Sequence, residues 1–308
     1  MLEGENEREL PFRKLVMELV ILIAGALFIS SLLTPSLFQF LRSIMGEDLW
    51  PYSRVFDRVI MVVAVVMLFL RRHHYGVAVY KKSLVGMLSK PRVKPLVVGF
   101  FLSFCLSIAA LPIVVSGGTL VWSDNSTGVI LWRFFKTLPA AAVISIIEEV
   151  FFRFFLFLSL RRYLPFALAA VLSSLLYSVV HFIQPVKTWE FTELSVFTGF
   201  EYLGLLLDRF TQEGFLPAAF GLFLIGMVLC LTVERSNSLL PALGLHAGWV
   251  TTTKVIGKLV ESASWFDYPS GSGRRYYLLT HEFTWLTVCL VGLVAFLVFK
   301  KKSEKEAD

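Results

Sequence analysis

The stretch SIIEEVFFRFFLFL, residues 145–158, decides how this chain folds. Glu148 and Glu149 stand side by side in it, Arg153 follows, and the apolar run around them extends from Leu138 to Leu160. A charged side chain at the centre of a bilayer costs about 2.5–3.5 kcal/mol on insertion scales. Three ionisable groups so close together in a membrane-length apolar run therefore predict a functional site.

The composition identifies an integral membrane protein. The 308 residues are 56% hydrophobic and 17% charged, with a mean hydropathy of +0.71, whereas a soluble protein carries about 25% charged residues. The net charge of +6 does not indicate a nucleic-acid partner, because Lys and Arg cluster at the ends of apolar segments. At those positions they orient the chain and contact the headgroups of the lipid bilayer.

Eight apolar runs reach or approach the roughly 20 residues that a helix needs to cross a bilayer. They are Leu15–Leu41, Pro51–Leu70, Pro95–Val115, Leu138–Leu160, Leu164–Ile183, Phe215–Val233, Leu239–Ile256 and Phe283–Phe299. We therefore predict an all-α integral membrane protein with about eight transmembrane helices and no internal repeat. Gly and Asp-Asn-Ser signals predict turns at 116–128, and residues 184–214 are expected to form a long polar connection.

The chain is expected to divide into three regions. Residues 1–128 form an N-terminal transmembrane region of three helices, 129–257 a core that carries the ionisable groups, and 258–308 an outer loop, the last helix and a basic tail. With both termini in the cytoplasm, the inner segments carry roughly twice as many Lys and Arg residues as the outer loops. We therefore expect cytoplasmic termini, in the cell (inner) membrane of a prokaryote.

Five ionisable side chains on three of these helices are candidates for chemistry. Glu149 and Arg153 are spaced i, i+4 and can pair on one helical face, whereas Glu148 is rotated about 100° away. His181 and His246 lie in two further spans. A single intramembrane histidine often only joins helices. The complete set is better explained by a site facing the interior of the bundle.

These residue types are suited to the hydrolysis of an amide bond. A glutamate in an apolar setting can exchange protons near neutral pH, one histidine can share a water with it, and another can donate to a developing oxyanion. Glu and His are also zinc ligands. The spacing of residues 148, 181 and 246 contains no HExxH-type pair, so a metal-dependent reaction stays open as an alternative.

Three motifs resemble those of the CAAX-protease and bacteriocin-processing (CPBP) family, intramembrane proteases related to the type II CAAX prenyl endopeptidase. EEVFFR, residues 148–153, resembles the family's EExxxR, and Tyr177 to His181 resembles FxxxH with Tyr for Phe. Residues 238–249 resemble the third motif region. The resemblance covers about residues 135–257 and implies a four-helix catalytic core in the C-terminal half.

The resemblance also implies a role for each residue. Glu148 would be the base for the attacking water, His181 would help to hold that water, and His246 would help to form the oxyanion hole. Glu149 and Arg153 would be supporting residues that orient the site. In this family mechanism the attacking group is water activated by glutamate, and no cofactor is required.

One position departs from the family pattern. Four residues after His246, where the family has Asn or Asp, this chain has Val250, so one oxyanion donor is missing. The indole N–H of Trp249 or the hydroxyl of Thr251 or Thr253 could replace it. Only Trp249 and Thr253 share the helical phase of His246, which makes Trp249 a further supporting candidate.

The sequence thus predicts an intramembrane endopeptidase of the glutamic type, acting on a membrane-associated protein or peptide. A zinc-dependent protease that uses the same Glu/His set is the mechanistic alternative. The missing Asn also leaves room for a catalytically silent scaffold that binds a partner peptide. A proton-coupled transporter is disfavoured, because the sequence shows one cluster and no repeat.

Overall fold

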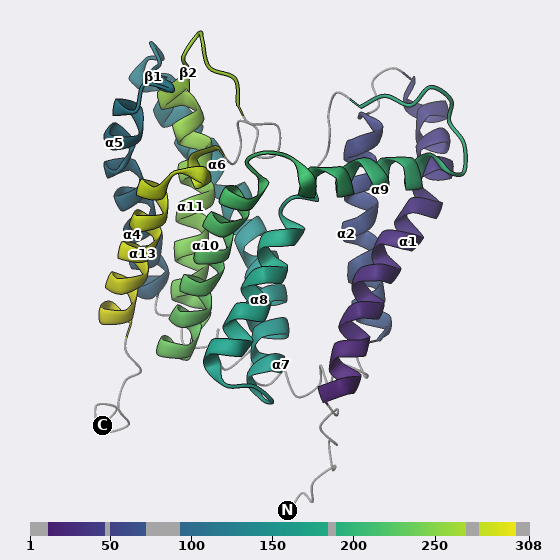
Figure 1. Cartoon of the computed structure of the whole chain (residues 1–308), viewed down its shortest axis with the longest axis horizontal. Coiled ribbons are helices and arrows are strands. Elements are labelled where there is room, and N and C mark those ends of the chain that lie inside the picture. Colours follow the sequence, from purple (N-terminus) through teal and green to yellow (C-terminus); the bar gives the residue numbers. More distant parts are fainter. Residues whose placement is uncertain (1–11, 47–49, 72–92, 184–188, 269–276, 300–308) are drawn as a thin grey trace, which may run out of the picture. The chain divides into compact units, whose positions relative to one another are not determined.

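The computed structural model describes residues 12–46, 50–71, 93–183, 189–268 and 277–299 (Figure 1). Within these residues the chain divides into two compact units. The first unit combines Met1–Ser83 with His181–Thr211, and the second combines Leu84–Val180 with Gln212–Asp308. This division differs from the predicted linear order of three regions, because the third and the last apolar runs belong to the same unit as the Glu-Glu helix.

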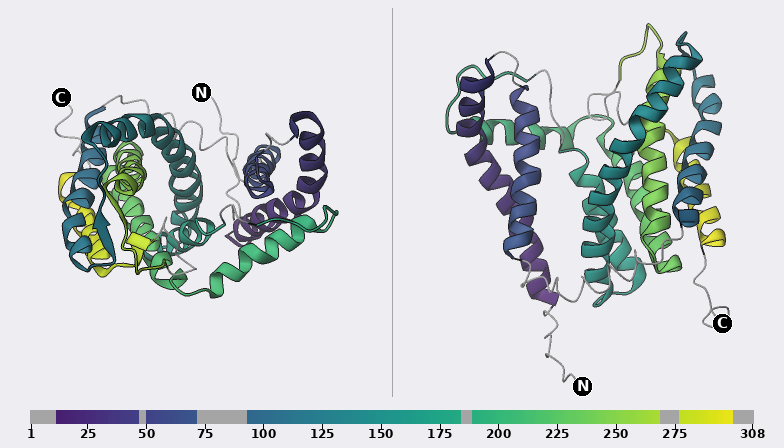
Figure 2. Two further views of the ribbon diagram at one scale, coloured as in Figure 1. Left: turned by 90° about the horizontal axis from the view of Figure 1, so that it is seen from above. Right: turned by 180° about the vertical axis from the view of Figure 1, so that it is seen from behind.

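The first unit contains α1 (Phe12–Met45), α2 (Tyr52–Leu70), α9 (Thr198–Asp208) and the short 3-10 helix η3 (Arg209–Thr211). Helices α1 and α2 pack along each other, and α9 crosses α1 (Figures 1 and 2). A bidentate ion pair joins the first two helices: the guanidinium of Arg71 donates to both carboxylate oxygens of the buried Glu18, at 2.6 and 2.7 Å.

Helix α9 corrects the prediction that residues 184–214 form only a polar connection. Its buried side is made by Thr198, Gly199, Tyr202 and Leu206, while Glu201 and Asp208 are exposed. This spacing buries one face of a helix even though the segment as a whole is polar. Gly199 permits the crossing, because a Cβ at that position would lie 2.0 Å from the carbonyl oxygen of Ser31.

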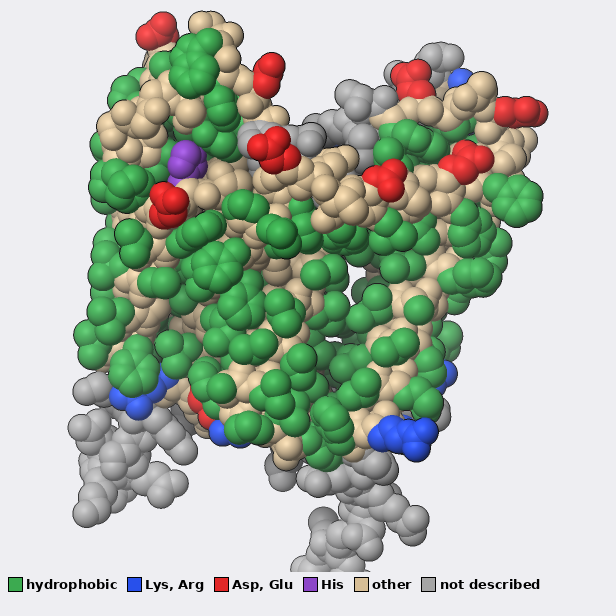
Figure 3. Space-filling model, viewed as in Figure 1, with side chains coloured by type: hydrophobic (Ala, Val, Ile, Leu, Met, Phe, Trp, Pro, Cys, Tyr) green, Lys and Arg blue, Asp and Glu red, His purple; other side chains and the backbone are tan. Residues whose placement is uncertain are grey.

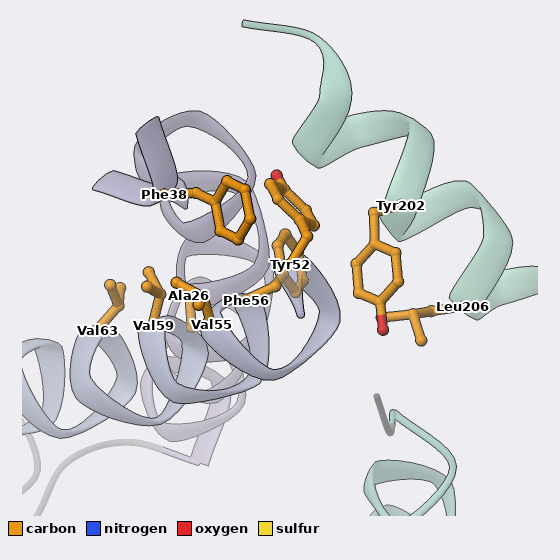
Figure 4. Packing of buried hydrophobic residues seen from close by; sticks show 9 residues of the cluster. All are labelled: Ala26, Phe38, Tyr52, Val55, Phe56, Val59, Val63, Tyr202 and Leu206. Carbon is orange, nitrogen blue, oxygen red and sulfur yellow. The ribbon is translucent and has the colours of Figure 1, made fainter. Parts of the chain in front are cut away.

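An aromatic cluster holds this unit together (Figure 4). Tyr52 lies at its centre, with ring centroids 5.2 Å from Phe38 and 5.9 Å from Tyr202. The ring of Tyr202 also stands edge-on to Phe56, at 5.0 Å. Burying such rings contributes most of the packing energy available to a small unit. The predicted span at 51–70 is therefore a helix with a buried face.

The second unit is a bundle with α11 at its centre. Its helical segments, in chain order, are α4 (Val93–Ala109), α5 (Leu111–Ser116), α6 (Thr127–Glu149), the π-helix η2 (Val150–Phe157), α7 (Leu158–Arg161), α8 (Phe166–Val180), α10 (Phe215–Ser236), α11 (Leu240–Leu259), the 3-10 helix η4 (Tyr277–Thr280) and α13 (Glu282–Val298). Helix α11 packs against α4 and α6, and α10 packs against α8 and α13 (Figure 2).

Glycines bring α11 into close contact with α4. A Cβ at Gly244 would lie 2.0 Å from the carbonyl oxygen of Leu96, and one at Gly248 would lie 2.4 Å from that of Phe100. Ser103 of α4 adds a polar contact, because its hydroxyl donates to the carbonyl of Leu245 at 2.8 Å. Small residues at such contacts are typical of helix pairs in membranes. The position of α11, and with it His246, is thereby fixed against α4.

A short antiparallel pair of strands closes one end of the second unit. Strand β1 (Leu120–Trp122) pairs with β2 (Val260–Ser262), with Leu120 opposite Ser262. The region at 116–128, predicted as turns, thus also contains a strand. The two strands have three residues each, and the all-α fold class is confirmed.

Every apolar run that was predicted to cross the membrane is helical. In the described part of the chain, α1, α10 and the segment Val93–Ser116 are long and apolar enough to span a bilayer, and α8 and α13 are shorter apolar helices. Apolar side chains cover the sides of the helices, and acidic and basic side chains gather at helix ends (Figure 3). Most of the Lys and Arg residues of the predicted inner segments lie at 1–11, 72–92 and 300–308, outside the described residues.

Candidate active site

The two glutamates lie where the helix changes its geometry. Helix α6 ends at Glu149, and the π-helix η2 follows directly, so the predicted continuous span at 138–160 is interrupted. Consecutive residues from Phe152 to Phe157 are buried, which places this segment inside the bundle and not against lipid. π-Helical turns are rare and are frequently found at functional sites.

His246 contacts both glutamates, one on each ring nitrogen. Its Nδ1 lies 2.7 Å from Oε1 of Glu149, and its Nε2 lies 3.6 Å from Oε2 of Glu148. Glu149 and His246 are buried, whereas Glu148 keeps 27% of its side chain exposed. With Nδ1–H donated to Glu149, Nε2 is the nitrogen that faces Glu148. The glutamates therefore differ: one anchors the imidazole and the other is the accessible carboxylate.

Arg153 forms an ion pair with the second carboxylate oxygen of Glu149. Its Nε lies 3.4 Å from Oε2, and both side chains are completely buried. The guanidinium also lies over the ring of Tyr177, with Cζ 4.4 Å from the ring centroid, and 5.8 Å from that of Phe152. A buried carboxylate needs such compensation. Glu149 thus joins two partners, with His246 on one oxygen and Arg153 on the other.

Helix α8 places Tyr177, the first residue of the motif that ends at His181, beside His246 and Arg153. Its ring stands edge-on to His246, with centroids 6.1 Å apart and an interplanar angle of 84°. His181 follows directly after the end of α8 and belongs to the first unit. The contribution of His181 to this site stays a prediction.

The candidate replacements for the missing Asn differ in their contacts. The hydroxyls of Thr251 and Thr253 donate to carbonyls of their own helix, those of Ala247 and Val250, at 2.8 and 2.9 Å. Trp249 is buried, and among the described residues its Nε1 has no hydrogen-bond acceptor. The indole N–H is therefore the donor that is not already used within α11.

The site gathers Glu148, Glu149, Arg153, Tyr177 and His246 from four helical segments of one unit, α6, η2, α8 and α11. From the sequence, Tyr177 was identified only as the first residue of the motif that ends at His181, and its contacts with Arg153 and His246 were not predicted. In the described residues, no group of three or more His, Cys, Asp or Glu side chains is arranged to hold a metal ion. The set can accept a proton at Glu148 and donate one from the imidazole.

Residues 130–252 match the family model described as type II CAAX prenyl endopeptidase Rce1-like. The matched segment begins within α6 and ends within α11, and so contains all five side chains described above. The search of curated proteins and the search of solved structures each gave no match.

Proposed function

Residues 130–252 match the type II CAAX prenyl endopeptidase family model, and on that premise we propose that the chain is a member of the CAAX-protease family and an intramembrane endopeptidase of the glutamic type. The family implies a protease that acts on a membrane-associated protein or peptide. Our proposal adds the residues that perform the reaction. The observation that carries it is the contact of His246 with one glutamate on each ring nitrogen.

Glu148 is proposed as the general base. It is the partly exposed member of the glutamate pair, so a water molecule can reach it. Glu148 takes one proton from this water while the water oxygen attacks the carbonyl carbon of the scissile amide. The carbonyl π electrons move to the oxygen, and a tetrahedral oxyanion forms. We propose that His181 helps to hold the attacking water.

His246 is proposed to stabilise the oxyanion. In the doubly protonated form of the imidazole, Nδ1–H is donated to Glu149 and the proton on Nε2 can be donated to the oxygen that becomes negative. A preorganised donor of this kind is worth roughly 10²–10³ in rate. When the intermediate collapses, the C–N bond breaks. Glu148 then returns its proton to the leaving amine, which restores the carboxylate and balances the reaction.

The test compares the wild type with Glu148→Gln in liposomes. The first probe is a fluorescence-quenched peptide whose farnesylated cysteine is followed by three C-terminal residues. The second probe is the same peptide without the farnesyl group. We expect the wild type to cleave at least one of them and the variant to cleave neither, because the amide keeps the volume of the carboxylate but cannot accept the proton.

The controls separate the alternatives. Full activity after chelation of divalent metals supports the glutamic mechanism, whereas loss on chelation and recovery with zinc supports the metal-dependent reaction. Cleavage by Glu148→Gln at the wild-type rate would remove Glu148 as the base. If the wild type binds both peptides but cleaves neither, and no membrane protein accumulates in cells that carry Glu148→Gln, the chain is a silent scaffold.

We also propose that both ends of this chain lie on the cytoplasmic side. The support is the distribution of Lys and Arg among the loops. Tags before residue 12 and after residue 299 should both be modified by a membrane-impermeant reagent only after the inner face of the membrane is opened. Modification of one tag from outside would require an odd number of crossings.

A further inference from the structure

We propose that Tyr177 is a positioning residue of this site: its ring holds the guanidinium of Arg153 and the imidazole of His246 in the orientations in which Glu149 binds both. This inference rests on the proposed function for its effect on rate. Its geometric part stands on contacts within the second unit alone.

The first argument is the charge of Arg153. The side chain is completely buried, and among the described residues neither terminal nitrogen has a hydrogen-bond acceptor. The contacts that compensate the cation include the carboxylate of Glu149, 3.4 Å from Nε, the face of the Tyr177 ring, 4.4 Å from Cζ, and the more distant Phe152 ring at 5.8 Å. A cation within about 6 Å of an aromatic centroid is attracted, most strongly when desolvated. The ring therefore takes part in holding this arginine.

The second argument is that the same ring also touches the other partner of Glu149. Tyr177 stands edge-on to His246 at 6.1 Å and to Phe152 at 5.1 Å. A smaller aliphatic side chain would leave a gap beside both groups, because buried residues pack without space to spare. Arg153 and the imidazole could then each change rotamer, and the hydrogen bond from Nδ1 to Glu149 would lose its fixed geometry.

The third argument is that α8 is anchored on both sides of Tyr177. The hydroxyl of Ser173 donates to the carbonyl of Phe152 in the π-helix at 3.1 Å, and that of Ser178 donates to the carbonyl of Ala219 in α10 at 2.6 Å. Gly226 of α10 lets α8 approach closely, since a Cβ there would lie 2.8 Å from Cβ of Ser174. The ring is thus held by a rigid element, as a positioning residue requires.

The test uses three variants in the liposome assay. Tyr177→Leu removes the π face, Tyr177→Phe keeps it, and Phe157→Leu is the matched control. Phe157 is also a buried ring, in the same π-helix as Arg153, and packs against Phe166. We expect Tyr177→Leu to lower kcat about tenfold or more with little change in KM. Tyr177→Phe should stay near the wild type, and Phe157→Leu should lower thermal stability without this loss of kcat.

A second readout does not depend on catalysis. Isotope-labelled histidine in lipid nanodiscs gives the imidazole nitrogen signals, and His246→Gln assigns those of His246. Tyr177→Leu should shift these signals, whereas Tyr177→Phe and Phe157→Leu should leave them in place. If Tyr177→Leu keeps both the wild-type kcat and the His246 signals, the proposal is overturned. If the wild type cleaves no probe, the proposed function fails, and the nitrogen signals alone decide whether Tyr177 positions His246.

Discussion

Glu149 and His246 form a buried hydrogen-bonded pair, with Oε1 2.7 Å from Nδ1, although 97 residues separate them in the chain. The pair joins the end of α6 to the middle of α11. Because the other oxygen of Glu149 faces Arg153 at 3.4 Å, one carboxylate orients the imidazole and compensates a buried cation at the same time. Stability and catalysis should therefore respond together at Glu149 and separately at Glu148.

The adjacent glutamates allow a matched comparison. Glu148→Gln should abolish proteolysis and leave the melting temperature almost unchanged, because this side chain is 27% exposed. Glu149→Gln makes the same chemical change at a fully buried position. It should lower the stability by about 3–5 kcal/mol, since the charge of Arg153 is left without its counter-ion. Thermal unfolding and cleavage of the same preparations measure both effects. Equal melting temperatures for the two variants would contradict the structural role of Glu149.

The second prediction concerns the buried ion pair between Glu149 and Arg153. Arg153→Ala alone should reduce the yield and the stability, because it leaves the carboxylate of Glu149 buried and uncompensated. In the double variant Glu149→Gln/Arg153→Met neither charge remains, and most of the lost stability should return without the activity. A double-mutant cycle of unfolding free energies measures this coupling. Normal stability of Arg153→Ala together with complete loss of activity would instead give Arg153 a direct role in the reaction.

Much of this architecture could be read from local patterns. Apolar runs of membrane length predicted the helices. The i, i+4 spacing of Glu149 and Arg153 predicted their ion pair, because residues four apart are neighbours on a helix surface. The helical phase likewise selected Trp249. In contrast, the hydrogen bond between Glu149 and His246 joins distant segments and depends on how helices pack. Helix α9 was missed because its 11 residues are too few to cross a bilayer and because acidic residues are spread through the segment around it.

The third prediction concerns the glycine that allows α4 and α11 to pack closely. Gly244→Ala should reduce folding and activity, because its Cβ would lie 2.0 Å from the carbonyl oxygen of Leu96 and would push α11 away. Gly257→Ala is the matched control on the same helix, since a Cβ there meets no atom of the described residues within 4 Å. It should keep or slightly increase the stability, as Ala favours helix over Gly by about 1 kcal/mol. Size-exclusion profiles and thermal unfolding in detergent would measure both changes. A well-folded, active Gly244→Ala would show that the helices can separate without disturbing His246.

The last prediction concerns the oxyanion donor that Val250 replaces. Trp249 is buried with an indole N–H that has no acceptor among the described residues, whereas the hydroxyls of Thr251 and Thr253 are already bonded to carbonyls of α11. Trp249→Phe keeps a ring and removes the N–H, so it should lower kcat by up to about 10²-fold if the indole stabilises the oxyanion.

Val250→Asn tests the same point from the opposite direction. Position 250 lies one helical turn beyond His246, so an Asn there can direct its amide toward the same oxygen. The half-buried position has room for a side chain of similar size, and we expect the fold to persist with equal or higher activity. In Trp249→Phe/Val250→Asn the added amide should restore part of the rate, because one donor replaces another. Unchanged rates in Trp249→Phe, combined with a loss of activity in Val250→Asn, would mean that Val250 packs against the substrate and that other groups hold the oxyanion.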